Sequence, residues 1–166
     1  VVLCLATVVT ACEPLPEDVG LRISEVLHSE QCAVEQPTAY VIESASQWRS
    51  LQTRDGRFLP EPSEPGPDAS PEPVLGADET LVVIAAGQQP STGYRVIVDT
   101  YDWQRTQDAL ILQVKLDSPP ADALQATVLT SPCSVVSLRN HQGIEQVQFV
   151  GLKTALSVRL PLPETP

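Results

Sequence analysis

The chain has 166 residues, with 16 prolines and a formal net charge of -11. This length is typical of one domain and predicts a single core. Sixteen prolines exclude a helical bundle, because each ring removes a backbone donor and blocks helical continuation. The negative charge would repel a phosphate backbone, which excludes nucleic acid as the expected partner.

The N-terminal stretch has the features of an export signal. Residues 1–11, VVLCLATVVTA, carry no charge and precede Cys12 and a proline-rich acidic stretch. The run is shorter than the roughly 20 apolar residues that span a bilayer, but it is typical of a secretory signal. The sequence VTAC at 9–12 resembles a bacterial lipobox. This resemblance implies cleavage before Cys12 and lipidation of Cys12 by acyl chains such as palmitate.

The signal predicts where the protein lies in the cell. We expect a disordered lipoprotein signal segment at 1–11 and a tether at 12–19. Two or more acyl chains hold a protein stably at a membrane. Glu13 gives no inner-membrane retention signal, so we expect an outer-membrane lipoprotein facing the periplasm. The alternative interpretation of residues 1–11 is a buried N-terminal strand.

Removal of residues 1–11, which include Cys4, would leave two cysteines besides the lipidated Cys12. They are Cys32 and Cys133, about a hundred residues apart. Export into an oxidising compartment predicts that they form a disulfide. Closing so long a loop would stabilise the fold by on the order of 4 kcal/mol. Two buried thiols or a metal site are the alternatives, but the chain has no CxxC spacing and only His28 and His141 as further ligands. We therefore expect no metal and no other cofactor.

Hydrophobic periodicity predicts an all-β fold, mainly an antiparallel sandwich or barrel-like pair of sheets, with one short helix. The capping-box pattern from Ser44 to Gln47 predicts that helix, with Trp48 and Leu51 on one face. A proline-rich, acidic loop is expected at 60–73 within one β domain at 20–160. The expected strands are 20–27 and 39–43, which flank the Cys32 turn as a hairpin, and 81–86, 94–101, 110–117, 125–130, 133–138 and 146–150.

The sequence GQQPSTGY at 87–94 lies between two of these strands. Gly93 allows a positive φ, Pro90 fixes its own φ, and Ser91 and Thr92 have hydroxyls for the nearby backbone, so a rigid loop is expected. A catalytic role for Ser91 would need an adjacent base, and the chain has no Gly-x-Ser-x-Gly, His-Glu-x-x-His or phosphate-binding glycine motif. We expect a protein that is not an enzyme. The alternative is an ordinary turn, with Tyr94 as a core side chain.

Several segments in this order resemble the C-terminal domain of the protease-complex subunit PrcB family. They are AYVIESASQWRSL, the proline-rich gap, ETLVVIAAGQQPSTGYRVIV and TSPCSVVSL, together spanning about residues 39–139. Gly87, Pro90, Thr92, Gly93 and Tyr94 match the family's loop. The chain departs from the pattern where the second glycine of the usual pair is absent and where Cys133 replaces an aromatic residue.

The resemblance implies a small non-catalytic domain, often on a lipoprotein, that binds and stabilises or modulates an envelope protease or other protein partner. The expected partner-binding loop consists of Gln88, Gln89, Pro90, Ser91, Thr92, Gly93 and Tyr94. The segment at 89–94 is also similar to the loop with which chagasin-like cysteine protease inhibitors, immunoglobulin-like sandwiches, enter the active-site cleft of their target. Inhibition of a cysteine protease is therefore the alternative function, although Gln89 stands where that family has Asn.

Overall fold

A computed structural model describes residues 20–54 and 79–161. The expected signal segment at 1–11, Cys12, the tether and the proline-rich loop at 60–73 lie outside the described residues. Within the described part of the chain, no helix has the length and apolar character needed to cross a membrane.

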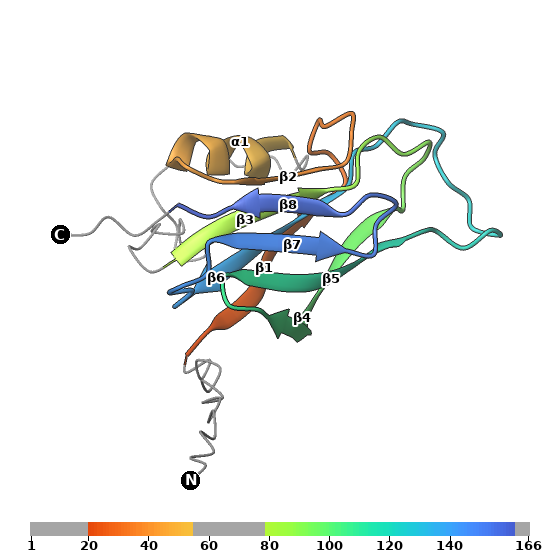
Figure 1. The fold of residues 1–166 in the computed structure, drawn as a ribbon. Coiled ribbons are helices and arrows are strands. Elements are labelled where there is room, and N and C mark those ends of the chain that lie inside the picture. Colours follow the sequence, from red (N-terminus) through yellow and green to blue (C-terminus); the bar gives the residue numbers. More distant parts are fainter. Residues whose placement is uncertain (1–19, 55–78, 162–166) are drawn as a thin grey trace, which may run out of the picture.

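The described residues form two four-stranded sheets and one helix (Figure 1). The first sheet has the strand order β1-β6-β3-β2 and is antiparallel throughout. The second has the order β4-β5-β7-β8, in which only β5 and β7 pair in parallel. The all-β prediction is confirmed. The elements are β1 (Arg22–Ser29), β2 (Thr38–Val41), α1 (Ala45–Arg54), β3 (Glu79–Ala85), β4 (Arg95–Arg105), β5 (Ala109–Asp117), β6 (Cys133–Arg139), β7 (Gln146–Val150) and β8 (Leu156–Arg159).

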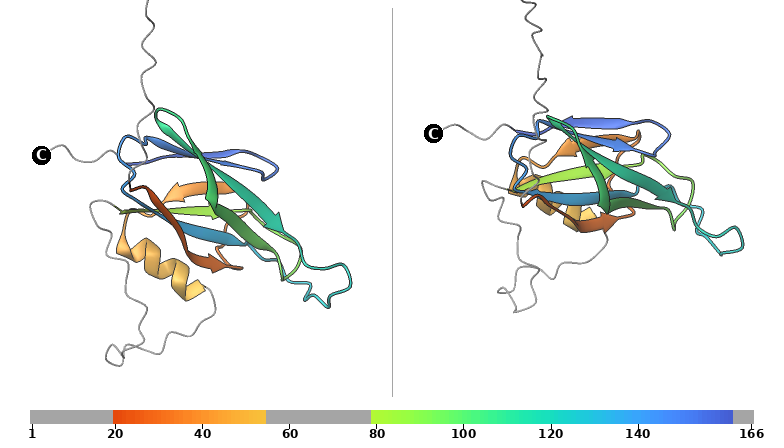
Figure 2. Two further views of the ribbon diagram at one scale, coloured as in Figure 1. Left: turned by 90° about the horizontal axis from the view of Figure 1, so that it is seen from below. Right: turned by 60° about the horizontal axis from the view of Figure 1, so that its bottom comes forward.

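The main core lies between the two sheets, which Figure 2 shows as two layers. Alternation along each strand sends every second side chain inward. Val96 and Val98 of β4 are buried while Ile97 between them is exposed, as the sequence predicts. Leu112 of β5 and Phe149 of β7 are completely buried in the same core. The two sheets also approach each other at both edges, where β1 contacts β4 and β2 contacts β8.

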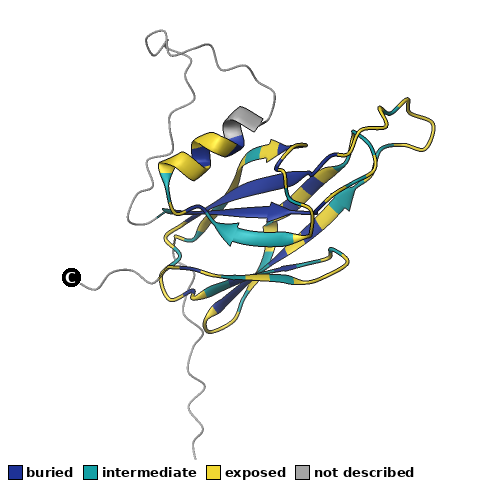
Figure 3. Ribbon diagram, turned by 90° about the horizontal axis from the view of Figure 1, so that it is seen from above, coloured by how far each residue is buried: buried dark blue, intermediate teal, exposed yellow. Residues whose placement is uncertain are grey.

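The outer face of the first sheet is covered by α1, so that β3 is buried on both faces (Figure 3). This explains the unbroken apolar run at 81–86, which is typical of a strand covered on both sides. The helix begins as predicted: the Gln47 N–H donates to Ser44 Oγ at 3.3 Å, and Gln47 Oε1 accepts from the N–H of Glu43 at 2.7 Å. Trp48 and Leu51 are buried against the sheet.

The predicted N-terminal hairpin is wrong. Strands β1 and β2 lie at opposite edges of their sheet, with β6 and β3 between them. The reason is that β6 pairs with β1 on one side and with β3 on the other. This order places the two most apolar strands, β3 and β6, in the middle of the sheet with a neighbour on each side. A local hairpin of β1 and β2 would have prevented it.

Two further strand predictions also need correction. Residues 125–130 form no strand; only Thr130 makes an isolated bridge, with Gln89. Val128 and Leu129 are exposed, so the apolar character of this segment reflects something other than core packing. The strand β8 was missed because Leu156–Arg159 is short and half-buried, with a weak pattern.

The predicted disulfide is confirmed, joining Cys32 to Cys133 with the two Cα atoms 6.1 Å apart. Cys133 opens β6 as expected, and Cys32 follows the end of the neighbouring strand β1. The Cys32 N–H also donates to the carbonyl of Ser131 at 2.9 Å. The bridge therefore ties the segment after β1 to the start of β6.

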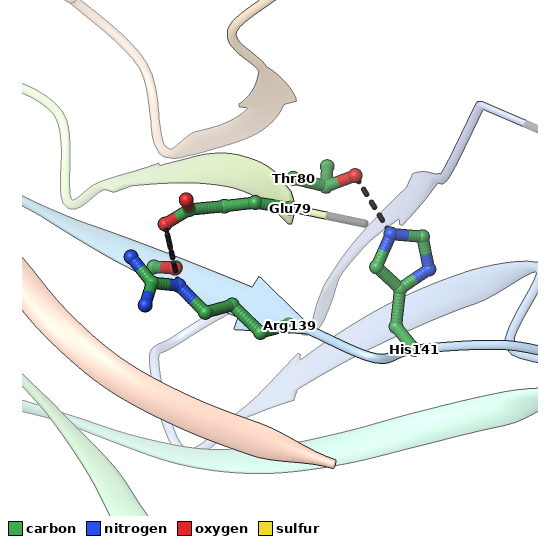
Figure 4. Close-up of polar contacts among 5 residues, drawn as sticks. Glu79, Thr80, Arg139 and His141 are labelled. Carbon is green, nitrogen blue, oxygen red and sulfur yellow. Dashed lines mark hydrogen bonds and ion pairs between the residues drawn. The ribbon is translucent and has the colours of Figure 1, made fainter. Parts of the chain in front are cut away.

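A polar cluster lies at the other end of β3 and β6 (Figure 4). Glu79 accepts hydrogen bonds from the Ser137 hydroxyl and from Arg139, whose Nε lies 3.1 Å from the carboxylate. Burial raises the pKa of Glu79, but these two donors and the charge of Arg139 lower it, and the net pKa lies below the ordinary value of 4.5. On the opposite face of the sheet, Thr80 Oγ1 lies 2.8 Å from His141 Nε2.

Candidate interaction arm

The loop at 87–94 connects β3 to β4 and lies beside the long connection from β5 to β6 (Figure 1). Both views in Figure 2 show residues 118–130 projecting beyond the ends of the sheets. Hydrogen bonds join Gln89, Ser91 and Thr92 of the first segment to residues at 125–130 of the second. We call residues 87–94 and 118–130 together the arm.

The root of the arm is fixed by Gly87. This residue is buried with a φ of +74°, and a Cβ there would come within 2.9 Å of backbone atoms at 35–37. Only glycine combines that backbone conformation with such close contact. The next residue, Gln88, donates its N–H to the carbonyl of Glu35 at 3.1 Å. The first loop is therefore anchored to the segment that contains Cys32.

In the middle of the arm, a reciprocal pair of backbone hydrogen bonds joins the two segments. The backbone of Gln89 exchanges two hydrogen bonds with that of Thr130, at 2.8 and 3.0 Å. The buried Thr130 side chain donates to the carbonyl of Ser91 at 2.8 Å. These bonds fix the register of the two segments, because each satisfies a specific donor on the other.

The outer contact of the first loop is made by Thr92 and Gly93. The Thr92 N–H donates to the carbonyl of Ala126 at 3.2 Å, and the Ala126 N–H donates to Thr92 Oγ1 at 3.3 Å. Gly93 has the positive φ that the sequence predicts, +87°. A Cβ at Gly93 would lie 2.7 Å from Gln125 Oε1, so glycine also allows this close approach.

Beyond these contacts the arm exposes an apolar surface. Leu124 is fully exposed, Leu129 is 62 % exposed and Val128 is 54 % exposed. Pro90 is exposed on the first loop, whereas Tyr94 is only half-buried. Figure 3 shows the same end of the molecule as mainly exposed.

The sequence predicted the first of the arm's two segments, 87–94, but not the second. Ser91 donates its hydroxyl to the carbonyl of Thr92 at 3.2 Å, the local bond expected of it. The other residues of the predicted loop also lie between two strands; they are Gln88, Gln89, Pro90, Thr92, Gly93 and Tyr94. Sequence reasoning missed residues 118–130, which it interpreted in part as a core strand. The signal was the Ser-Pro-Pro stretch at 118–120, which is typical of a strand end.

Both histidines of the chain lie outside the arm. His141 is paired with Thr80, and His28 Nδ1 lies 3.5 Å from a guanidinium nitrogen of Arg95. Within residues 20–54 and 79–161, no three or more His, Cys, Asp or Glu side chains are grouped so that they could hold a metal ion. The arm itself exposes Leu124, Val128 and Leu129, and apolar side chains on a projecting segment are suited to contact with another molecule.

Comparison with known families supports the resemblance that the loop suggests. Residues 80–139 match the family described as PrcB C-terminal. The match runs from the start of β3 to the end of β6 and includes both segments of the arm. The resemblance is confirmed for this part of the chain, and the match leaves out residues 39–79. No curated protein and no solved structure matches the chain.

Proposed function

We propose that the protein is a non-catalytic, lipid-anchored envelope protein whose β domain binds an envelope protease or another envelope protein through Gln88–Tyr94. The single observation that carries the proposal is the loop itself. Hydrogen bonds to neighbouring segments and the close packing of Gly87 and Gly93 hold this loop at one end of the sandwich, with Gln88, Pro90 and Gly93 left exposed. A pre-organised loop loses little conformational entropy on binding.

The family match supports the class of partner. The matched segment contains the whole loop, and the resemblance implies a protein that works in a protease complex. The partner's identity and the direction of the effect on it, activation, stabilisation or inhibition, are questions for the same experiment.

A pull-down with matched variants tests the proposal. The mature protein recovers a partner from envelope extract, and Gly93→Val and Tyr94→Ala weaken the recovery at a temperature at which circular dichroism shows both variants to be folded. Val26→Ala, on the exposed side of β1, is the control that leaves recovery unchanged. The proposal fails if no recovered protein depends on the loop.

The lipid anchor is a separate part of the proposal, and its motivation is the VTAC sequence at 9–12. Cys12→Ser should release the protein from the membrane fraction and stop maturation, because a hydroxyl does not replace the thiol that forms the thioether. Cys4→Ser is the matched control and should mature normally. A Cys12→Ser protein that still sediments with membranes at mature size would show that the lipobox interpretation is wrong.

Inhibition of a cysteine protease is the second candidate. The observation that favours it is the position of the Gln89–Tyr94 loop at one end of a two-sheet sandwich. Mature protein should then slow papain-type proteases, and Gly93→Val should relieve the inhibition. Full protease activity at micromolar protein removes this candidate and leaves the docking proposal standing.

A further inference from the structure

The second segment of the arm has exposed apolar side chains that fold stability does not explain. Leu124, Val128 and Leu129 lie outside both hydrophobic clusters of the fold. Large apolar side chains exposed on a projecting segment are a feature of surfaces that contact other molecules. Ala126 and Thr130 are also hydrogen-bonded to the proposed docking loop at Thr92 and Gln89, which places the two segments side by side.

The charge of the arm indicates the chemistry of its partner. Of the residues at 87–94 and 118–130, Asp122 is the only one with a formal charge, whereas charged residues make up 19 % of the chain. An uncharged surface gains nothing from a charged one and would desolvate it at a cost. The complementary surface is therefore largely uncharged and is apolar opposite Leu124, Val128 and Leu129, with room for at most one cation opposite Asp122.

The composition of the arm also argues against lipid as the occupant. Residues 118–130 contain no Trp, Tyr, Phe, Lys or Arg, the side chains that favour the membrane interface. Asp122 would be repelled by an anionic lipid surface. A projecting shape with side chains on its outside fits a concave site, which a folded protein provides.

We propose that residues 118–130 form a second contact surface, which inserts Leu124, Val128 and Leu129 into an apolar cleft of the same protein partner that binds Gln88–Tyr94. This inference rests on the proposed docking function and extends it to a segment that the loop resemblance does not include. Binding through such a surface depends little on salt, because few charges are involved.

Site-specific photocrosslinking in intact cells tests the inference. Benzoylphenylalanine is placed at Gln88, at Leu124 or, as the matched exposed control, at Tyr101 on β4, all in the full-length chain. Gln88 and Leu124 should give adducts with the same partner, and Tyr101 none. With that partner purified, Leu129→Ser should weaken binding about tenfold, while Tyr101→Ser leaves it unchanged. Raising salt from about 0.05 to 0.5 M should change the affinity less than about threefold.

The outcomes separate the two proposals. An adduct at Gln88 without one at Leu124, or full affinity in Leu129→Ser, overturns this inference and leaves the docking function intact. Absence of adducts at both positions overturns both. An adduct of Leu124 with lipid or with a second copy of the chain, or a steep loss of affinity with salt, contradicts the apolar cleft.

Discussion

The paired strands β3 and β6 and the arm are joined in sequence, yet their apolar residues are used in opposite ways. Leu81, Val83 and Val135 are completely buried between α1 and the first sheet. The arm has equally aliphatic side chains that lie in solvent, those of Leu124, Val128 and Leu129. The strands are held by continuous ladders, and the arm by a few bonds between two loops.

The difference shows that apolar character alone does not distinguish stability from recognition in this chain. What distinguishes them is whether a second layer covers the segment. Substitutions in β3 and β6 should change the free energy of unfolding, whereas truncation of exposed side chains on the arm should change binding alone.

The largest effect is expected at the disulfide, which adjoins both regions. Replacing Cys32 and Cys133 together by Ser should lower the free energy of unfolding by about 4 kcal/mol, because the bridge closes a loop with a sequence separation of 101 residues. Denaturant unfolding of the oxidised wild type and the variant gives this difference. Partner binding should persist at low temperature. Equal stability of the two proteins would show that the bridge has no constraining role.

The next prediction compares the same substitution in the two regions. Leu81→Ala should lower the free energy of unfolding by about 3 kcal/mol, because the side chain is completely buried and leaves a cavity. Leu124→Ala should change it by less than about 0.5 kcal/mol, because that side chain is fully exposed. Urea titration measures both. Similar losses in the two variants would mean that the arm contributes to the core after all.

A pair of glycines sharpens the comparison between the root and the outer part of the arm. Gly87→Ala should cost about 2 kcal/mol, since its Cβ would approach backbone that cannot move aside. Gly93→Ala should cost about 1 kcal/mol, since the nearest atom belongs to the flexible Gln125 side chain. Thermal unfolding of both variants is the measurement. A larger loss of stability at Gly93 than at Gly87 would contradict the assignment of Gly87 as the rigid root of the arm.

The smallest effect concerns pH and belongs to the strand region. The pKa of Glu79 lies below its ordinary value of 4.5, so its stabilising contribution is fully present above that pH and is lost as the pH falls through the lower folded pKa. Glu79→Gln should therefore reduce the difference in unfolding free energy between about pH 7 and pH 3. Ser137→Ala, which removes one donor, should reduce it less. An unchanged pH dependence in Glu79→Gln would contradict this assignment.

The sequence predicted what depends on local pattern. The alternation of apolar and polar residues located β4 and β5, and the apolar run at 81–86 indicated a strand covered on both faces. Ser44 marked the start of α1. It did not predict which strands pair, because the placement of β6 between β1 and β3 is decided by contacts between strands far apart in the sequence. For the same reason Gly93 was located in the loop, but its neighbour Gln125, 32 residues further along, was not.

Hydrogen exchange of the free protein and of its complex with the recovered partner tests the docking role of the arm most directly. Binding should slow exchange at residues 87–94 and 118–130 and leave α1 and the segment around Tyr101 unchanged. Protection confined to α1 or to the exposed side of β4, with the arm exchanging as fast as in the free protein, would contradict the assignment of the arm as the interaction surface.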